Sequence, residues 1–93
     1  MSYPYYPEAI QTRTIRLVDG ERKRQEDKWG EQNHDDLFWL AILSEEVGEV
    51  AQALLQQKEG NKSWLEIHEE LVQVAAVALA WLEAFDRKGH YDD

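Results

Sequence analysis

Hydrophobic side chains recur at helical spacing in three segments, and no part of the chain alternates polar and apolar residues as a strand does. The first segment opens at Pro7, which suits the first turn of a helix, and ends near Trp29, just before Gly30. The pair Asp19-Gly20 lies in its middle and is expected to loosen this helix or break it.

Two more apolar segments follow short connections. We expect a second helix from Asp36 to Lys58, with Asn33 or Asp35 as its capping residue. The third helix opens with a capping box, in which the side chains of Ser63 and Glu66 each accept a hydrogen bond from the other's backbone. Because the connection between these two helices is short, they are expected to pack antiparallel.

The third predicted helix, which ends near Arg87, carries more apolar surface than one chain is expected to cover. Between Leu71 and Leu82 only Gln73 is polar, whereas a helix on a protein surface shows a single apolar stripe. We therefore expect one all-α domain over residues 1–93, with three main helices. It should assemble as a homo-oligomer, a dimer or a tetramer, into a four-helix-type bundle. Membrane contact is the alternative, but a spanning helix needs about 18 unbroken apolar residues.

Composition and charge narrow the functions that this fold serves. The chain has 10 Lys+Arg against 19 Asp+Glu and a net charge of −9, which argues against binding to a nucleic-acid backbone. It contains no cysteine, so a thiolate zinc site, a disulfide and a cysteine nucleophile are excluded. The N-terminal residues show no basic region followed by an apolar one, and we expect a soluble cytoplasmic protein.

Two groups of polar side chains lie at the border of the apolar region. Glu46 and Glu49 stand three residues apart, so they share one face of the second helix, and Glu45 lies beside them. In an antiparallel helix pair they face Glu70 and Gln73 of the third helix.

Clustered carboxylates in a half-buried site must take up protons or bind a cation. Oxygen ligands select hard ions, so the pattern indicates a Mg²⁺ site open toward a phosphate ligand, with Mn²⁺ as a substitute. The alternative is that these acids form ordinary solvated helix faces paired with Arg or Lys. Glu66 is the weakest ligand candidate, because the capping box already explains it.

Other motifs add little. The chain has neither of the usual glycine-rich phosphate loops. Glu31 and His34 match the Glu-x-x-His spacing of di-iron helix bundles, but they lie in a predicted linker and a second copy is missing. No His-acid pair accompanies a serine, so a serine nucleophile has no support.

The segments EEVGEVAQALL and EELVQVAAVALAWLE resemble the all-α nucleoside triphosphate pyrophosphohydrolases of the MazG-like group, which includes dimeric dUTPases and dCTP pyrophosphatases. That family's signature is Glu-x-x-Glu followed by Glu-x-x-Asp. Glu46 and Glu49 match its first half, and Glu70 and Gln73 match the second half, with Gln in place of Asp. The resemblance covers about residues 13–87 and leaves tails at 1–7 and 88–93.

The resemblance implies an enzyme that hydrolyses a nucleotide between its α and β phosphates and releases the monophosphate and pyrophosphate. The expected substrate is a nucleoside triphosphate, in particular a dNTP, and the expected role is house-cleaning of the nucleotide pool. Glu46, Glu49 and Glu70 would ligate Mg²⁺, with Gln73 in the fourth position. Glu46 or its neighbour Glu45 would activate the attacking water.

Candidate substrate contacts complete this picture. The phosphates need cations, and the candidates are Arg24, Lys28, Lys58 and Lys62. The base needs an aromatic surface to stack on, and the candidates are Trp29 and Trp39. The alternative for each is a solvated cation or a packing residue. Because Gln73 brings no charge, a non-catalytic helical oligomer that binds a nucleotide or a partner protein is the alternative function.

Overall fold

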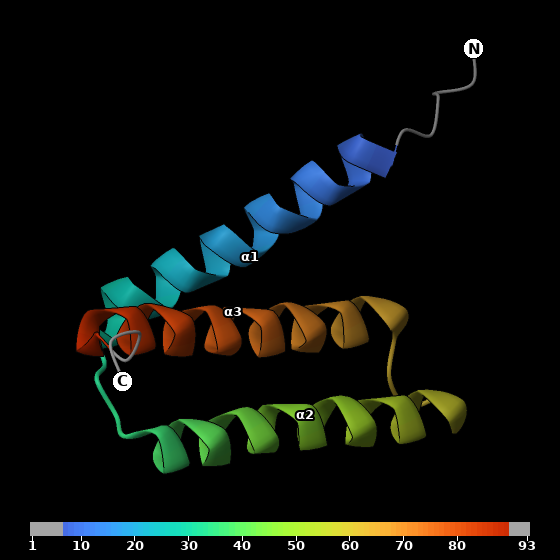
Figure 1. Cartoon of the computed structure of the whole chain (residues 1–93). Helices are drawn as coiled ribbons and strands as arrows, with labels where there is room; N and C mark the ends of the chain where they lie inside the picture. The colour runs from blue at the N-terminus through green and yellow to red at the C-terminus, as the bar shows by residue number, and fades with distance from the viewer. Residues whose placement is uncertain (1–6, 90–93) are drawn as a thin grey trace.

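The computed structural model describes residues 7–89, and within that range the chain is all-α with no strand. Its helices are α1 (Pro7–Trp29), α2 (Asp36–Lys58) and α3 (Trp64–Lys88), shown in Figure 1. Pro7 is the first residue of α1, in agreement with its expected place in the first turn, and Lys88, which we expected in the C-terminal tail, is the last residue of α3. The other residues of both expected tails lie outside the described range, except Gly89.

Capping side chains set the N-terminal ends of α2 and α3, as predicted. The Asp35 carboxylate, rather than Asn33, caps α2 by accepting a hydrogen bond from the backbone N–H of Phe38 at 2.9 Å. In front of α3, the Ser63 hydroxyl accepts from the backbone N–H of Glu66 at 3.2 Å. The Glu66 carboxylate accepts from the backbone N–H of Ser63 at 2.9 Å, which completes the capping box.

Helix α1 is continuous through Gly20, so the break allowed by the sequence does not occur. Its second half is attached to α3 by Arg22, which is only 8% exposed. The guanidinium of Arg22 donates to the carboxylate of Glu83 on α3 at 3.0 and 2.7 Å, and to Glu26 on α1 at 2.6 Å. This partly buried ion pair therefore ties the second half of α1 to α3.

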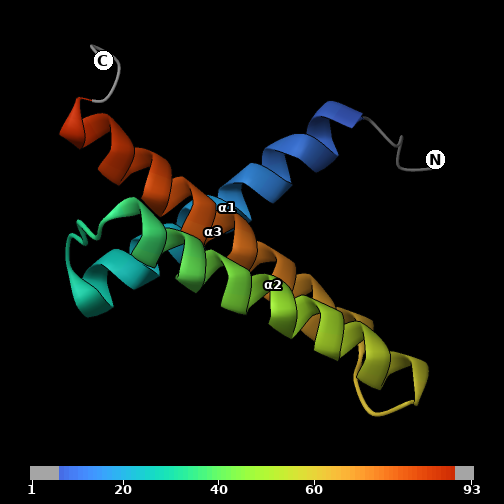
Figure 2. The same ribbon diagram turned by 60° about the horizontal axis from the view of Figure 1, so that its bottom comes forward.

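Helix α3 lies between the other two helices. It packs antiparallel to α2 and also against α1, whereas α1 and α2 do not pack against each other within the described residues. Figures 1 and 2 show the N-terminal half of α1 diverging from the α2–α3 pair. The core joins Trp39 of α2 to Val77, Ala80 and Ala84 of α3. The small alanine side chains allow the two backbones to approach closely.

Much apolar surface stays uncovered in the single chain. Thirteen large hydrophobic side chains of the described part are 44–80% exposed. They include Leu71 and Leu82 on α3, at 52% and 58%, in agreement with the expected apolar excess of that helix. Between the diverging half of α1 and α3 lies an open apolar groove of about 740 Å³ that Ile15 and Leu82 line. The described helices are all too polar, at their lengths, to cross a lipid bilayer.

Candidate functional site

Three carboxylates from two helices meet in the α2–α3 pair. Glu46 and Glu49 on α2 and Glu70 on α3 each offer one oxygen atom, and these atoms lie within 4.8 Å of one another. The antiparallel packing brings the three together, as the spacing of the acids predicted. Glu49 is exposed, whereas Glu46 and Glu70 are half-buried, so the cluster opens to solvent on the Glu49 side.

Two carboxylate oxygens of this cluster are buried and accept no hydrogen bond. They are Oε2 of Glu46 and Oε2 of Glu70. Burial raises the pKa of Glu46, and the negative charges of Glu49 and Glu70 raise it further. Burial likewise raises the pKa of Glu70, helped by the charge of Glu49, while Lys62 acts in the opposite direction. The described protein groups therefore leave the negative charge of the ionised carboxylates and their lost hydration largely uncompensated.

The donor set of this cluster fits a hard divalent cation. All three candidate ligands are carboxylates, whose oxygen atoms suit hard divalent cations, and two of them have unpaired buried oxygens. The alternative from the sequence was that these acids are paired with Arg or Lys. No ion pair of the described side chains involves Glu46, Glu49 or Glu70. Gln73, one turn after Glu70 on α3, lines a pocket together with Glu46.

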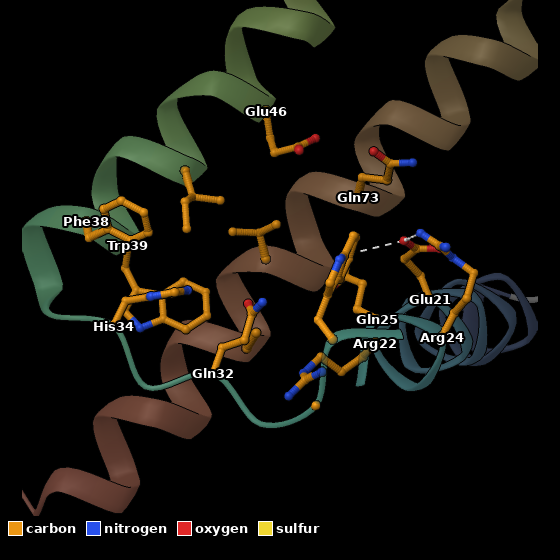
Figure 3. A pocket seen from close by; sticks show the side chains of 15 residues that line it. Glu21, Arg22, Arg24, Gln25, Gln32, His34, Phe38, Trp39, Glu46 and Gln73 are labelled. Carbon is orange, nitrogen blue, oxygen red and sulfur yellow. Dashed lines mark hydrogen bonds and ion pairs between the residues drawn. The ribbon is translucent and has the colours of Figure 1, made fainter. Parts of the chain in front are cut away.

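That pocket, of about 390 Å³, lies between the three helices and the linker that joins α1 to α2. Figure 3 shows Glu46 and Gln73 at one end, Glu21 and Arg24 on the α1 side, and His34, Phe38 and Trp39 at the other end. Along α2 it extends from Phe38 to Glu46, a separation of eight residues, or about 12 Å of helix. Its size falls in the range of pockets that hold small ligands.

The structure brings some of the predicted substrate residues into this pocket and leaves others outside. Arg24, Trp29 and Trp39 line it. Trp29 is 54% exposed, so its ring offers a face to a ligand, whereas Trp39 is 2% exposed and belongs to the core. The lining does not include the ammonium-bearing side chains Lys28, Lys58 and Lys62.

The three lysines have other surroundings. The ammonium of Lys28 lies 4.8 Å from the centre of the Trp29 ring, in a cation–π contact. Lys58 is exposed in the last turn of α2, and Lys62, half-buried in the α2–α3 connection, lowers the pKa of Glu70. Glu45 is exposed beside Glu46 and does not line the pocket, although its charge contributes to the raised pKa of Glu46.

Apart from Arg24 and Trp29, the sequence analysis missed the pocket residues of α1 and of the linker. Glu21, Arg22 and Gln25 belong to a wholly polar stretch, which reads as a solvated helix face. Gln32 and His34 belong to the linker, where no periodicity reports which side chain points inward. One signal could have indicated the α1 residues: their polar stretch lies just before Trp29, which the sequence analysis names as a candidate for binding the base.

The last turn of α3 holds the linker in place. Arg87 donates from Nε to the side-chain oxygen of Asn33 at 2.9 Å and from Nη2 to the backbone carbonyl of Gln32 at 3.1 Å. The ammonium of Lys88 donates to the backbone carbonyl of His34 at 2.8 Å. The di-iron alternative gains no support, because Glu31 pairs with Arg87 at 3.5 Å and no other described ligand joins it and His34 in a cluster.

The raised pKa of Glu70 gives a prediction for the metal-free protein. Below the pKa of the unfolded chain the carboxyl is protonated in both states and has no effect on stability. As pH rises through the interval up to the higher folded pKa, the unfolded state loses its proton first, so the folded state is destabilised. In EDTA, Glu70→Gln should therefore raise Tm relative to wild type at pH 7.5 and less so at pH 4.5.

Circular dichroism at fixed protein concentration measures this difference, with Glu69→Gln as the exposed control next to Glu70. The control separates the burial of Glu70 from a general gain through lower net charge. An advantage of Glu70→Gln that stays the same from pH 4.5 to 7.5 would contradict the assigned cause.

No known protein family, curated protein or solved structure matches the chain. The function is therefore inferred from three features of the molecule itself. These are the carboxylate cluster, the adjoining pocket and the exposed apolar surface.

Proposed function

We propose that the protein is a Mg²⁺-dependent nucleoside triphosphate pyrophosphohydrolase. One observation carries the proposal: Glu46 and Glu70 hold buried, unpaired carboxylate oxygens in one cluster, and Glu46 also lines a pocket that has a guanidinium on its α1 wall. Carboxylates attract a divalent cation, and the cation together with Arg24 attracts phosphates to a chain of net charge −9. The resemblance of the Glu46–Gln73 segment to MazG-like enzymes agrees with this chemistry.

Glu46, Glu49 and Glu70 are the proposed Mg²⁺ ligands, with the amide oxygen of Gln73 as a neutral fourth. When bound, the ion lowers the pKa of coordinated water and neutralises phosphate charge. Glu46 is the better candidate for the general base than Glu45, because only Glu46 lines the pocket.

The proposed reaction is attack of water on the α phosphorus. The bond from this phosphorus to the oxygen bridging it to the β phosphorus breaks, pyrophosphate leaves with the bridging oxygen, and Glu46 takes the proton of the water. The length of the pocket along α2 fits a nucleotide whose phosphates lie near Glu46. Its base would then lie against the exposed ring of Trp29, with Trp39 forming the apolar floor.

We further propose that the working form is a homo-oligomer. Two-fifths or more of each of thirteen large apolar side chains is exposed in the described part of one chain. Two of them, Ile15 and Leu82, line the same apolar groove, and a contiguous apolar surface marks a protein interface. A second copy of this chain is the proposed partner, because it presents the same apolar groove between α1 and α3 and can cover the exposed apolar side chains of the first copy. A dimer and a tetramer both satisfy this requirement.

The test is pyrophosphate release from the four common dNTPs and from dUTP, measured with Mg²⁺, with Mn²⁺ and with EDTA. Release that needs the divalent ion is the expected result. Gln73 favours one other outcome, because it supplies no charge to the ion: a non-catalytic module that binds nucleotide. If no substrate releases pyrophosphate but dNTP with Mg²⁺ raises the Tm of the protein, the enzyme hypothesis is wrong and the non-catalytic nucleotide-binding module takes its place.

A further inference from the structure

The α1 wall of the pocket carries an ion pair between neighbouring turns of the helix. Arg24 donates from Nε to Oε1 of Glu21 at 2.9 Å and from Nη2 to Oε2 at 2.7 Å, so the pair is bidentate. Gln25 donates to the same Oε2 at 3.1 Å. Both members of the ion pair line the pocket, and Figure 3 shows them beside Gln73.

The bidentate edge of a guanidinium binds carboxylate and phosphate in the same way, through two parallel N–H···O bonds. Glu21 therefore occupies the edge of Arg24 that a phosphate group of a ligand would use. The side chain of Glu21 is 14% exposed and that of Arg24 is 53% exposed. The carboxylate is thus packed in place, while the guanidinium is accessible from the solvent.

The other cation of this wall is not available for such an exchange. Arg22 is 8% exposed and joins α1 to α3 through Glu83, so releasing it would loosen the fold. Among the described residues, Arg24 pairs only with Glu21 of its own helix, and surface pairs of this kind contribute little to stability. Exchange of the partner of Arg24 therefore leaves the packing of the helices unchanged.

The charge of Glu21 also acts on the carboxylate end of the pocket, where it is one of the charges that raise the pKa of Glu46. Hydrogen bonds from Arg24 lower the pKa of Glu21 itself, which keeps it ionised at neutral pH. The negative charge of Glu21 thus repels an incoming polyphosphate, and the same carboxylate occupies Arg24, the cation that would bind the phosphate.

We propose that Glu21 competes with phosphate for Arg24, so that a polyphosphate ligand enters by displacing Glu21 from the guanidinium. This inference rests on the proposed function, since it takes the pocket to be the nucleotide site. Glu21 then sets the affinity of the site: it weakens binding of every phosphate ligand and admits those that bring a divalent cation to offset the carboxylates. Removing its charge should therefore tighten binding, although it breaks an ion pair.

The experiment is isothermal titration of wild type and Glu21→Gln with inorganic tripolyphosphate in Mg²⁺, and with a non-hydrolysable dNTP analogue. The expected result is a Kd lower by about threefold to tenfold in Glu21→Gln, the effect of one nearby charge in a partly solvated site. In Glu21→Gln with Arg24→Gln the gain should disappear. Asp27→Asn, an exposed change of equal charge on the same helix, should leave the Kd within about twofold of wild type.

Equal or weaker binding by folded Glu21→Gln would overturn the inference, as would an equal gain in Asp27→Asn or binding too weak to detect in all variants. If Glu21→Gln loses its helical circular dichroism, Glu21→Ala takes its place in the same comparison. Failure of the proposed function is seen separately. If Glu21→Gln binds tripolyphosphate more tightly but the protein releases no pyrophosphate, the proposed enzyme activity is wrong and the role of Glu21 stands. If pyrophosphate is released but Glu21→Gln binds no more tightly than wild type, the activity stands and the role of Glu21 is wrong.

Discussion

Glu49→Gln is expected to lower pyrophosphate release by about 100-fold or more while the helical fold stays intact. Glu49 is the exposed member of the carboxylate cluster, so its replacement by the isosteric amide creates no cavity and buries no polar group. The change takes one of three negative charges from the proposed Mg²⁺ site. Several kcal/mol of transition-state stabilisation depend on the ion, and each loss of about 1.4 kcal/mol is tenfold in rate.

A second measurement separates loss of the ion from other causes. A ligand that binds only the folded state raises Tm with its concentration, so millimolar Mg²⁺ should stabilise wild type and have little effect on Glu49→Gln. Glu69→Gln, an exposed substitution of equal charge on α3, should retain both the activity and the response to Mg²⁺. Wild-type turnover in Glu49→Gln would remove the metal site from the mechanism.

Leu82→Glu is expected to convert the proposed homo-oligomer to a monomer. Leu82 is 58% exposed in the single chain and lines the apolar groove between α1 and α3. In an isolated chain the substitution would place a charge in water and cost little stability. In an interface it would bury an unpaired charge, which costs several kcal/mol at each copy. A large response of the assembly to this mutation therefore reports that the groove is covered.

Light scattering coupled to size exclusion gives the molar mass directly, against 10.9 kDa for one chain. Leu82→Met keeps the apolar contact and should keep the mass of wild type. If the wild-type protein elutes as a monomer at micromolar concentration, the homo-oligomer is wrong. If Leu82→Glu keeps the wild-type mass, the interface lies on another face.

The helices were predictable because their ends are encoded locally. Asp35 and Ser63 each precede an apolar segment, and a side-chain oxygen of each reaches the backbone three residues later. Part of the site followed from the same periodicity. A spacing of three residues aligns Glu46 with Glu49, and a short connection places Glu70 opposite them. Each of these inferences needs only neighbours in sequence and one antiparallel helix pair.

The α1 side of the site was not predictable in this way. Arg22 and Glu83 are 61 positions apart, and nothing in either local segment reports that they meet. The polar stretch after Gly20 has no hydrophobic period, so the burial of Arg22 is a property of the tertiary arrangement. The same applies to Trp39, because a sequence pattern does not separate a tryptophan in the core from one that stacks on a ligand.

The attachment of the linker by Arg87 and Lys88 has a consequence for the order of folding. Contacts between α2 and α3 can begin beside their short connection, whereas the bonds from the last turn of α3 to the linker lie at the far end of the pair and close a loop of more than fifty residues. Loops of that length are entropically costly to close, so the α2–α3 hairpin should form first and the linker should dock late. The carboxylate cluster would then exist before the pocket beside it is complete. The segments that form last are also those that open most readily in the native state, so the aromatic end of the pocket is where the folded protein should first admit solvent.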